Sequence, residues 1–382
     1  MPAAMLDWVE QEQQRSVRWR SENGSAPPRR VQLADDTLTA DAAFRLASEG
    51  TGLLWRGDFH NARQLLQALA KRVDRKPRNV GKPDPSEAGE AFHRHRMRQG
   101  QRARILAMLL IELEGDYAIK LRRAPDVRLA CGEAWGPGEG EPSVASLREL
   151  LGLVGAHEWR KKGVEIAALG PPPANRIHAH YGVFSPVRGE YIELVAQAPL
   201  PGNGLAFDIG TGTGVLAAVL ARRGLQRVVA TDQDPRALAC ARDNVDRLGL
   251  ASRIEVVQAD LFPPGAAPLV LCNPPWVPGR PSSPIERAVY DEDSRMLRGF
   301  LAGLPAHLAP GGEGWLILSD LAEHLGLRSR NQLLEWIDAA GLEVVARSEA
   351  RPHHPKAGDS DDPLYAARSR EVTSLWRLAL RR

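Results

Sequence analysis

The first group of residues with types and spacing suited to chemistry lies at 207–214, which read FDIGTGTG. Asp208 leads into glycines at every second position, Gly210, Gly212 and Gly214. Without a Cβ, glycine lets the backbone turn tightly and lets a ligand approach the main chain. A plain tight turn between a strand and a helix needs the same residues. The spacing departs from the dinucleotide fingerprint G-x-G-x-x-G, because Val215 takes the sixth position, so no pyrophosphate is required here.

Acidic residues follow at the ends of the next two β-rich runs. Asp232 closes RVVATD, eighteen residues after Gly214, and its carboxylate can accept hydrogen bonds from both hydroxyls of a ribose. Asp234 precedes Pro235, which is typical of a helix N-cap, so we assign Asp232 to a ligand and Asp234 to the helix. At the C-terminal end of RIEVVQAD, we interpret Asp260 and the Leu261 backbone as adenine contacts, with a solvated loop as the alternative.

A fourth run, LVLCNPPWVPG at 269–279, ends in an unusual turn. Asn273 is followed by two prolines and Trp276. Each proline removes a backbone donor and fixes a φ angle. Taken alone, this pattern favours a proline-rich turn whose tryptophan packs inward.

These turns need a scaffold, and from about residue 180 the pattern predicts one. Seven short β-rich runs alternate with helical runs of ten to fifteen residues: LAFDIG, RVVATD, RIEVVQAD, PLVLCN, GWLILSD, GLEVVARSEA and EVTSLWRLAL. Such alternation is typical of an α/β fold, a parallel sheet covered by helices on both faces.

The residues before 180 indicate a mainly helical domain. The period of DFHNARQLLQALAKRVDR and of SLRELLGLVGAHEWRKKGVEI predicts amphipathic helices, and the apolar run 105–113 predicts a buried one. The stretch 132–143, GEAWGPGEGEPS, is expected to be a loop or linker. At 382 residues the chain exceeds a single core, and we expect domains at 1–179 and 180–382.

Charge is uneven along the chain although the formal total is only +3. The basic segment 71–104 holds eleven Lys or Arg against four acids, a local net charge of +7. It is either the solvated face of a helical domain or a surface that contacts the phosphates of RNA or DNA.

The remaining features exclude several classes of protein. The three cysteines are widely spaced and have no nearby histidine, so no disulfide framework or zinc site is expected. His353 and His354 lack companion ligands, so no metal is expected there either. The chain shows no secretory signal and no apolar stretch of membrane-spanning length, so we expect a cytoplasmic protein without membrane contact.

In their order and spacing, FDIGTGTG, ATDQD, QADLF and NPPW resemble the class I S-adenosylmethionine-dependent methyltransferases. The likeness covers about 180–382 and points to the branch that carries NPPY, which includes HemK-like glutamine N-methyltransferases and "small domain" rRNA and tRNA methyltransferases. It implies a Rossmann-like seven-stranded sheet. It also implies cofactor contacts by Asp208, Gly210, Gly212, Gly214, Asp232 and Asp260, and substrate contacts by Asn273, Pro274 and Trp276.

Given this resemblance, the NPPW turn has a chemical interpretation. A planar nitrogen is a poor nucleophile because its lone pair is delocalised. If the Asn273 side-chain oxygen and the Pro274 carbonyl accept its two N–H bonds, the lone pair is directed at the methyl group and the developing positive charge is stabilised. The prolines stiffen the turn, and Trp276 offers a stacking surface.

The substrate is the least determined feature. The segment before the first strand, PVRGEYIE, departs from the P-R-P-x-T-E of glutamine methyltransferases, and Trp276 replaces tyrosine. We therefore expect N-methylation of a nucleic-acid base, with the N-terminal domain recruiting the RNA or DNA. Protein glutamine methylation is the alternative. A non-catalytic scaffold that binds the cofactor is a second alternative, against which the retained acids and NPPW turn argue.

Overall fold

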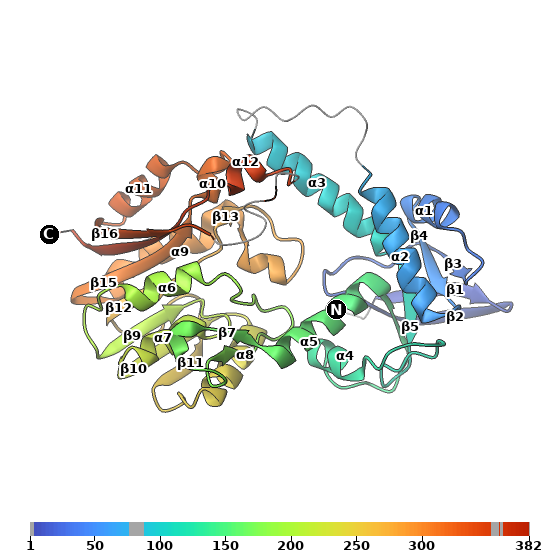
Figure 1. Ribbon diagram of the computed structural model, residues 1–382, viewed down its shortest axis with the longest axis horizontal. Coiled ribbons are helices and arrows are strands. Elements are labelled where there is room, and N and C mark those ends of the chain that lie inside the picture. Colours follow the sequence, from blue (N-terminus) through green and yellow to red (C-terminus); the bar gives the residue numbers. More distant parts are fainter. Residues whose placement is uncertain (1–3, 76–87, 353–358, 360–361, 382) are drawn as a thin grey trace. The chain divides into compact units, whose positions relative to one another are not determined.

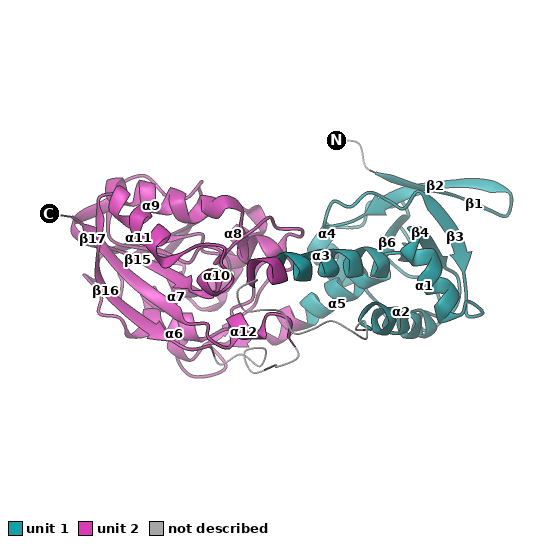
Figure 2. Ribbon diagram, turned by 90° about the horizontal axis from the view of Figure 1, so that it is seen from above, with its two compact units in different colours: residues 1–83, 93–158 teal, residues 84–92, 159–382 magenta. Residues whose placement is uncertain are grey.

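The chain divides into two compact units in the computed structural model, which describes residues 4–75, 88–352, 359 and 362–381. Unit 1 comprises Met1–Pro83 and His93–Glu158, and unit 2 comprises Asp84–Phe92 and Trp159–Arg382 (Figure 2). The division after Glu158 falls inside helix α5 (Leu147–Lys162), earlier than the expected boundary at 179/180. The stretch 132–143 lies within unit 1 and does not link the units.

Unit 1 is built on a six-stranded mixed sheet with the order β1-β2-β6-β5-β4-β3. Its strands are β1 (Met5–Glu10), β2 (Gln13–Arg20), β3 (Arg30–Ala34), β4 (Thr51–Trp55), β5 (Leu109–Leu113) and β6 (Ser143–Ser146). Its helices are α1 (Ala40–Ser48), α2 (Phe59–Val73), α4 (Arg128–Trp135), and parts of α3 (Ala88–Leu106) and α5.

The helices α2 and α5 confirm the two periodic predictions, whereas the apolar run 105–113 is not one helix. Helix α3 ends at Leu106 and strand β5 begins at Leu109. Leu109, Leu110 and Ile111 are fully buried because β5 lies between β4 and β6. A short apolar run fits a buried strand as well as a buried helix. The helices of unit 1 thus accompany a sheet that the helical period did not indicate.

Unit 2 contains the predicted seven-stranded sheet, with the order β11-β10-β9-β12-β15-β17-β16 (Figure 1). All seven β-rich runs are strands: β9 (Leu205–Ile209), β10 (Arg227–Asp232), β11 (Ile254–Gln258), β12 (Ala267–Cys272), β15 (Leu308–Ser319), β16 (Leu342–Ala350) and β17 (Thr373–Leu380). β17 runs antiparallel to both of its neighbours, and the other strands are parallel to one another.

The strands of unit 2 alternate their side chains between two cores. Leu269 and Leu271 of β12 pack with α6 (Glu190–Gln197), α7 (Val215–Arg222) and α8 (Pro235–Arg247). Val270 and Cys272 pack with α9 (Arg295–His307) and α11 (Arg330–Ala339) on the other face. Both faces of the sheet are therefore covered, as expected for a parallel sheet.

Short elements complete unit 2 near the ends of the strands. β13 (Val277–Pro278) pairs with β14 (Tyr290–Asp291), and β7 (Val164–Glu165) pairs with β8 (Arg176–Ile177). α10 (Leu321–His324) and α12 (Tyr365–Arg368) flank a small core in which Phe92, Val277 and Leu325 are buried. This contact explains why the first turns of α3 belong to unit 2.

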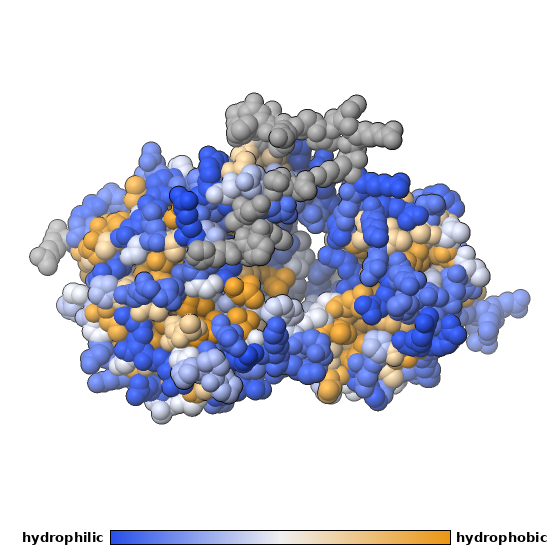
Figure 3. Space-filling model, in the orientation of Figure 1, coloured by the Kyte–Doolittle hydropathy of each residue, from blue (hydrophilic) through white to orange (hydrophobic). Residues whose placement is uncertain are grey.

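Polar and charged residues make up most of the face of each unit that Figure 3 shows. Within the described ranges, none of the helices combines the length and apolar character that crossing a membrane requires.

Candidate active site

Three neighbouring strands bring the predicted residues to one edge of the unit 2 sheet. In the register, Ile209 of β9 pairs with Cys272 of β12 and with Thr231 of β10. The turn 210–214, the turn 273–276 and Asp232 therefore all follow or end strands at the same carboxyl edge. This edge is where parallel α/β sheets bind ligands.

The turn 210–214 depends on glycine for its conformation. Gly210, Gly212 and Gly214 have φ of 70°, 55° and 79°, in the left-handed region that disfavours other residues. A Cβ on Gly210 would lie 2.5 Å from Met296 Cε, and one on Gly214 would lie 3.3 Å from Ala241. By contrast, a Cβ on Gly212 would have no protein atom within 4 Å among the described residues. The backbone of Gly212 is therefore open on the side where a side chain would project.

Asp232 joins this turn to the next strand. Its Oδ2 accepts the Gly212 N–H at 3.0 Å, and its Oδ1 accepts the Asp234 N–H at 2.9 Å. Burial raises the pKa of Asp232. A carboxylate has about four acceptor positions, so both oxygens keep capacity for further donors such as hydroxyl groups. Asp234 itself accepts the Arg236 N–H and caps α8, which confirms its assignment to the helix.

Asp208 is directed into the protein. Its side chain is 1% exposed, and Oδ2 accepts from the Thr211 hydroxyl at 2.6 Å and from the Ala217 N–H at 3.1 Å. Burial raises the pKa of this carboxyl to about 6. Asp208 thus connects the glycine turn to the first turn of α7 through these two hydrogen bonds. Its expected contact with a cofactor stays a prediction.

Asp260 and Leu261 lie on the loop after β11. Asp260 is exposed, and Leu261 adopts a φ of 69°. The Leu261 carbonyl accepts from the buried Thr231 hydroxyl at 2.6 Å. This bond ties the loop to β10, so Asp260 and Leu261 lie near the strand that carries Asp232.

The turn 273–276 has an internal hydrogen bond that the sequence did not predict. The Trp276 indole N–H donates to Asn273 Oδ1 at 2.8 Å. An amide oxygen has two lone pairs, so one remains for a substrate N–H. Pro274 is buried, and Trp276 is half-buried against the three apolar clusters around it. The Tyr191 ring meets Trp276 edge-on at 6.4 Å between centroids.

Arg188 is a site residue that the sequence reasoning missed. Its guanidinium carbon lies 4.8 Å from the Trp276 ring centroid. Its Nε donates to Glu190 at 2.6 Å, and both Nη atoms donate to Glu371 at 3.1 Å. Arg188 and Glu190 lie in PVRGEYIE, a segment from which the sequence reasoning drew only the identity of the substrate.

A second guanidinium contacts the same turn from the main-chain side. Arg328 is 3% exposed and donates from Nη2 to the Trp276 carbonyl at 3.4 Å. Burial lowers the pKa of Arg328, and its Nε has no hydrogen-bond partner among the described residues. Asp291 is 8% exposed and accepts the Met296 and Leu297 N–H groups. It therefore stabilises the start of α9.

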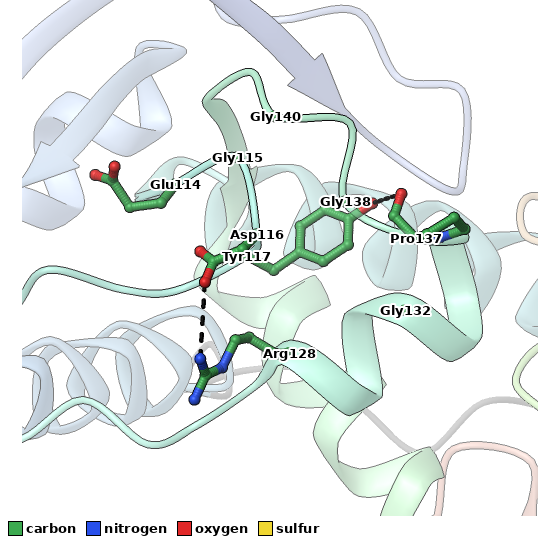
Figure 4. A pocket seen from close by; sticks show the side chains of 9 residues that line it. All are labelled: Glu114, Gly115, Asp116, Tyr117, Arg128, Gly132, Pro137, Gly138 and Gly140. Atoms are coloured by element: carbon green, nitrogen blue, oxygen red, sulfur yellow. Dashed lines mark hydrogen bonds and ion pairs between the residues drawn. The ribbon is translucent and has the colours of Figure 1, made fainter.

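Unit 1 carries a hollow of its own, with a volume of about 490 Å³ (Figure 4). The Tyr117 hydroxyl is directed at the Gly136 and Pro137 carbonyls, and Asp116 pairs with Arg128 at 3.7 Å. None of the residues predicted from the sequence lines this hollow. Within the described ranges, no three His, Cys, Asp or Glu side chains converge as a metal site. His353 and His354 lie outside those ranges.

Comparison with known proteins supports the interpretation of unit 2. Residues 174–330 match the family model "Methyltransferase small domain". A release factor glutamine methyltransferase of Cereibacter sphaeroides is 33% identical over 37% of this chain and 53% of its own length. A ribosomal protein L11 methyltransferase of Pelotomaculum thermopropionicum is 34% identical over 41% and 44%. A tRNA1(Val) (adenine(37)-N6)-methyltransferase of Shewanella loihica is 31% identical over 37% and 61%. The chain thus spans about half the length of these relatives.

The geometry fits the cofactor of this family, S-adenosylmethionine. Gly212 offers open main chain, and Asp232 offers a half-buried carboxylate with acceptor capacity for ribose hydroxyls. Residues 174–330 lie in unit 2 and span the glycine turn, Asp232 and the NPPW turn. Over residues 174–330, unit 2 is therefore similar to S-adenosylmethionine-dependent methyltransferases of the small-domain family.

Proposed function

We propose that the chain is an S-adenosylmethionine-dependent N-methyltransferase that acts on a planar amino or amide nitrogen of a macromolecule. The observation that supports this most strongly is the pairing of β9 with β12, after which the glycine turn and the NPPW turn follow at one edge of the sheet. A cofactor turn and a nitrogen-binding turn side by side are what methyl transfer to nitrogen requires.

Each residue has a distinct part in the proposed reaction. Bound S-adenosylmethionine supplies an electrophilic methyl group on a positively charged sulfur. Gly212 and Asp232 hold the cofactor, with Asp260 and Leu261 toward its adenine. Asn273 Oδ1 and the Pro274 carbonyl accept the two N–H bonds of the substrate and stabilise the developing positive charge. The proton leaves to water after transfer, so no carboxylate base is required.

We propose a nucleic-acid base as the substrate. The basic segment 71–104 supports this: eight of its eleven cationic residues are described, on α2, at Arg75 and on α3, and Arg98 and Arg104 are exposed on α3. Lys76, Arg78 and Lys82 lie outside the described residues. Methylation of a protein glutamine is the second candidate, favoured by the similarity to the release factor glutamine methyltransferase.

Asn273→Ala tests the proposed chemistry. The variant should lose turnover by about 100-fold or more while its affinity for S-adenosylmethionine, measured by calorimetry, stays nearly unchanged, because Asn273 contacts the substrate nitrogen and not the cofactor. Turnover equal to that of the wild type would contradict the mechanism.

The substrate class needs a separate experiment. Cell lysate lacking the gene is incubated with the purified protein and S-adenosylmethionine carrying a labelled methyl group, and RNA, DNA and protein fractions are then counted and analysed by mass spectrometry. Label in nucleosides supports the proposal. Label in glutamine of a protein would replace it with the second candidate.

A further inference from the structure

We propose that Trp276 and Arg188 are positioning residues for Asn273. The Trp276 indole fixes the orientation of the Asn273 amide, and Arg188 fixes the indole. The inference rests on the proposed function, since it assigns these residues to the same methyl-transfer site. It changes the expected role of Trp276 from a stacking surface alone to the group that orients the acceptor.

The first step of the argument concerns the amide. An indole N–H can only donate, so the group that faces it at 2.8 Å must be the oxygen of Asn273. The amide nitrogen consequently points away. With the oxygen held on the side of the indole, one of its two lone pairs stays available there for a substrate N–H. We infer that the substrate nitrogen lies on that side, so a flipped amide, which would place its own N–H groups there, could not accept from the substrate.

The second step concerns the indole itself. The Arg188 guanidinium lies over its face at 4.8 Å, and the Tyr191 ring abuts it edge-on. A cation over an indole face is attracted by the ring, most strongly where both are shielded from water. The Arg188 side chain is only 18% exposed. Trp276 is thereby held from two sides while its N–H remains directed at Asn273.

The third step concerns what holds Arg188. Glu190 and Glu371 are both buried and both accept from its guanidinium, and the Ser319 hydroxyl donates to the same Glu371 oxygen at 2.7 Å. Ser319 ends β15, and Glu371 precedes β17. Planar, two-sided pairing of this kind suits arginine and not lysine. The sheet edge thus fixes Arg188, Arg188 fixes Trp276, and Trp276 fixes Asn273.

The same contact limits how Trp276 can meet a substrate. One face of the Trp276 ring is covered by the guanidinium, so a substrate ring cannot stack there without displacing Arg188.

The test uses the full-length protein and four variants. Trp276→Phe keeps a flat ring but removes the N–H, and Arg188→Ala removes the cation. Both should lower kcat about 10- to 100-fold through misplacement of Asn273, with the Kd for S-adenosylmethionine unchanged within about twofold. Arg188→Lys should recover part of the loss. Arg347→Ala is the matched control, because Arg347 covers Trp376 at 4.4 Å outside this network, and its kcat should equal that of the wild type.

A second measurement does not depend on turnover. In protein with ¹⁵N-labelled tryptophan, the resonance that Trp276→Phe removes is the Trp276 indole. Its hydrogen exchange should be slow in the wild type and at least tenfold faster in Arg188→Ala, while Arg347→Ala leaves it unchanged. Equal exchange in the wild type and Arg188→Ala would overturn the proposal. A wild type that methylates nothing would refute the proposed function, and the exchange rates would still decide whether Arg188 holds the indole.

Discussion

Asp208 carries its carboxyl group into the interior of unit 2, in contact with Thr211 and the start of α7. From the sequence, the family resemblance implies that Asp208 contacts the cofactor. Its burial depends on the helix that folds back over it, which no local pattern specifies. Asp234, by contrast, was assigned correctly because capping involves only neighbours two residues away.

The burial of Asp208 predicts how stability depends on pH. Its pKa of about 6 in the folded state lies above the ordinary value of 3.8, so the native state binds the proton more tightly than the unfolded chain. The stabilisation by the neutral form is present below about pH 4 and is lost as the pH rises through 6. Relative to Asp208→Asn, the wild type should lose up to about 3 kcal/mol of unfolding free energy across this range.

Urea unfolding of both proteins between pH 4 and pH 7 measures this difference. Subtracting the two curves cancels the other buried carboxyl groups, which both proteins share. Parallel curves would mean that Asp208 does not titrate as its burial requires.

In the glycine turn between β9 and α7, we expect one glycine to serve cofactor binding and another to serve packing. Gly212 faces open space, whereas Gly214 packs against Ala241 of α8. We therefore expect glycine-to-alanine substitution to affect mainly cofactor binding at Gly212 and mainly stability at Gly214. Gly212→Ala should cost about 1 kcal/mol of stability from its φ angle and weaken S-adenosylmethionine binding about tenfold or more, because its Cβ would enter the open space in which we propose that the cofactor binds.

Gly214→Ala should reduce stability by more than Gly212→Ala, because strain and crowding against α8 add together, and should affect the intrinsic affinity for the cofactor less. Thermal unfolding and calorimetric titration of both variants separate the two effects. If both variants lost affinity for the cofactor in the same proportion to their loss of stability, the two glycines would not have separate roles.

At the level of elements, the sequence predicted unit 2 better than unit 1. Every strand of the seven-stranded sheet lies in a short β-rich run, and such runs can be recognised from the local sequence. In unit 1, β2 reads QQRSVRWR and is exposed over its first half, so its pairing with β1 and β6 leaves little apolar signal. The Arg188 contact with Trp276 joins residues far apart in the chain, so only the fold reveals it.

The family match covers part of unit 2 and none of unit 1, so the role of unit 1 has to be argued from its own residues. The family match at 174–330 lies in unit 2, and unit 1 carries most of the basic segment. Within that segment Arg72 pairs with Asp41 and Arg102 pairs with Asp74, both at 2.8 Å, so these two charges are partly offset. Arg98 and Arg104 are exposed and form no ion pair with the described residues. These two are the best candidates for phosphate contact.

Salt dependence tests this role of unit 1. For a fluorescent single-stranded RNA, the logarithm of the binding constant should fall linearly with the logarithm of salt concentration, by about 0.7 per phosphate neutralised. Arg98→Gln combined with Arg104→Gln should reduce this slope by about 1.4. Arg29→Gln combined with Arg63→Gln removes the same charge from exposed positions of unit 1 outside the segment and should leave the slope unchanged. If both pairs change the slope equally, the attraction is general and the basic segment does not position the RNA.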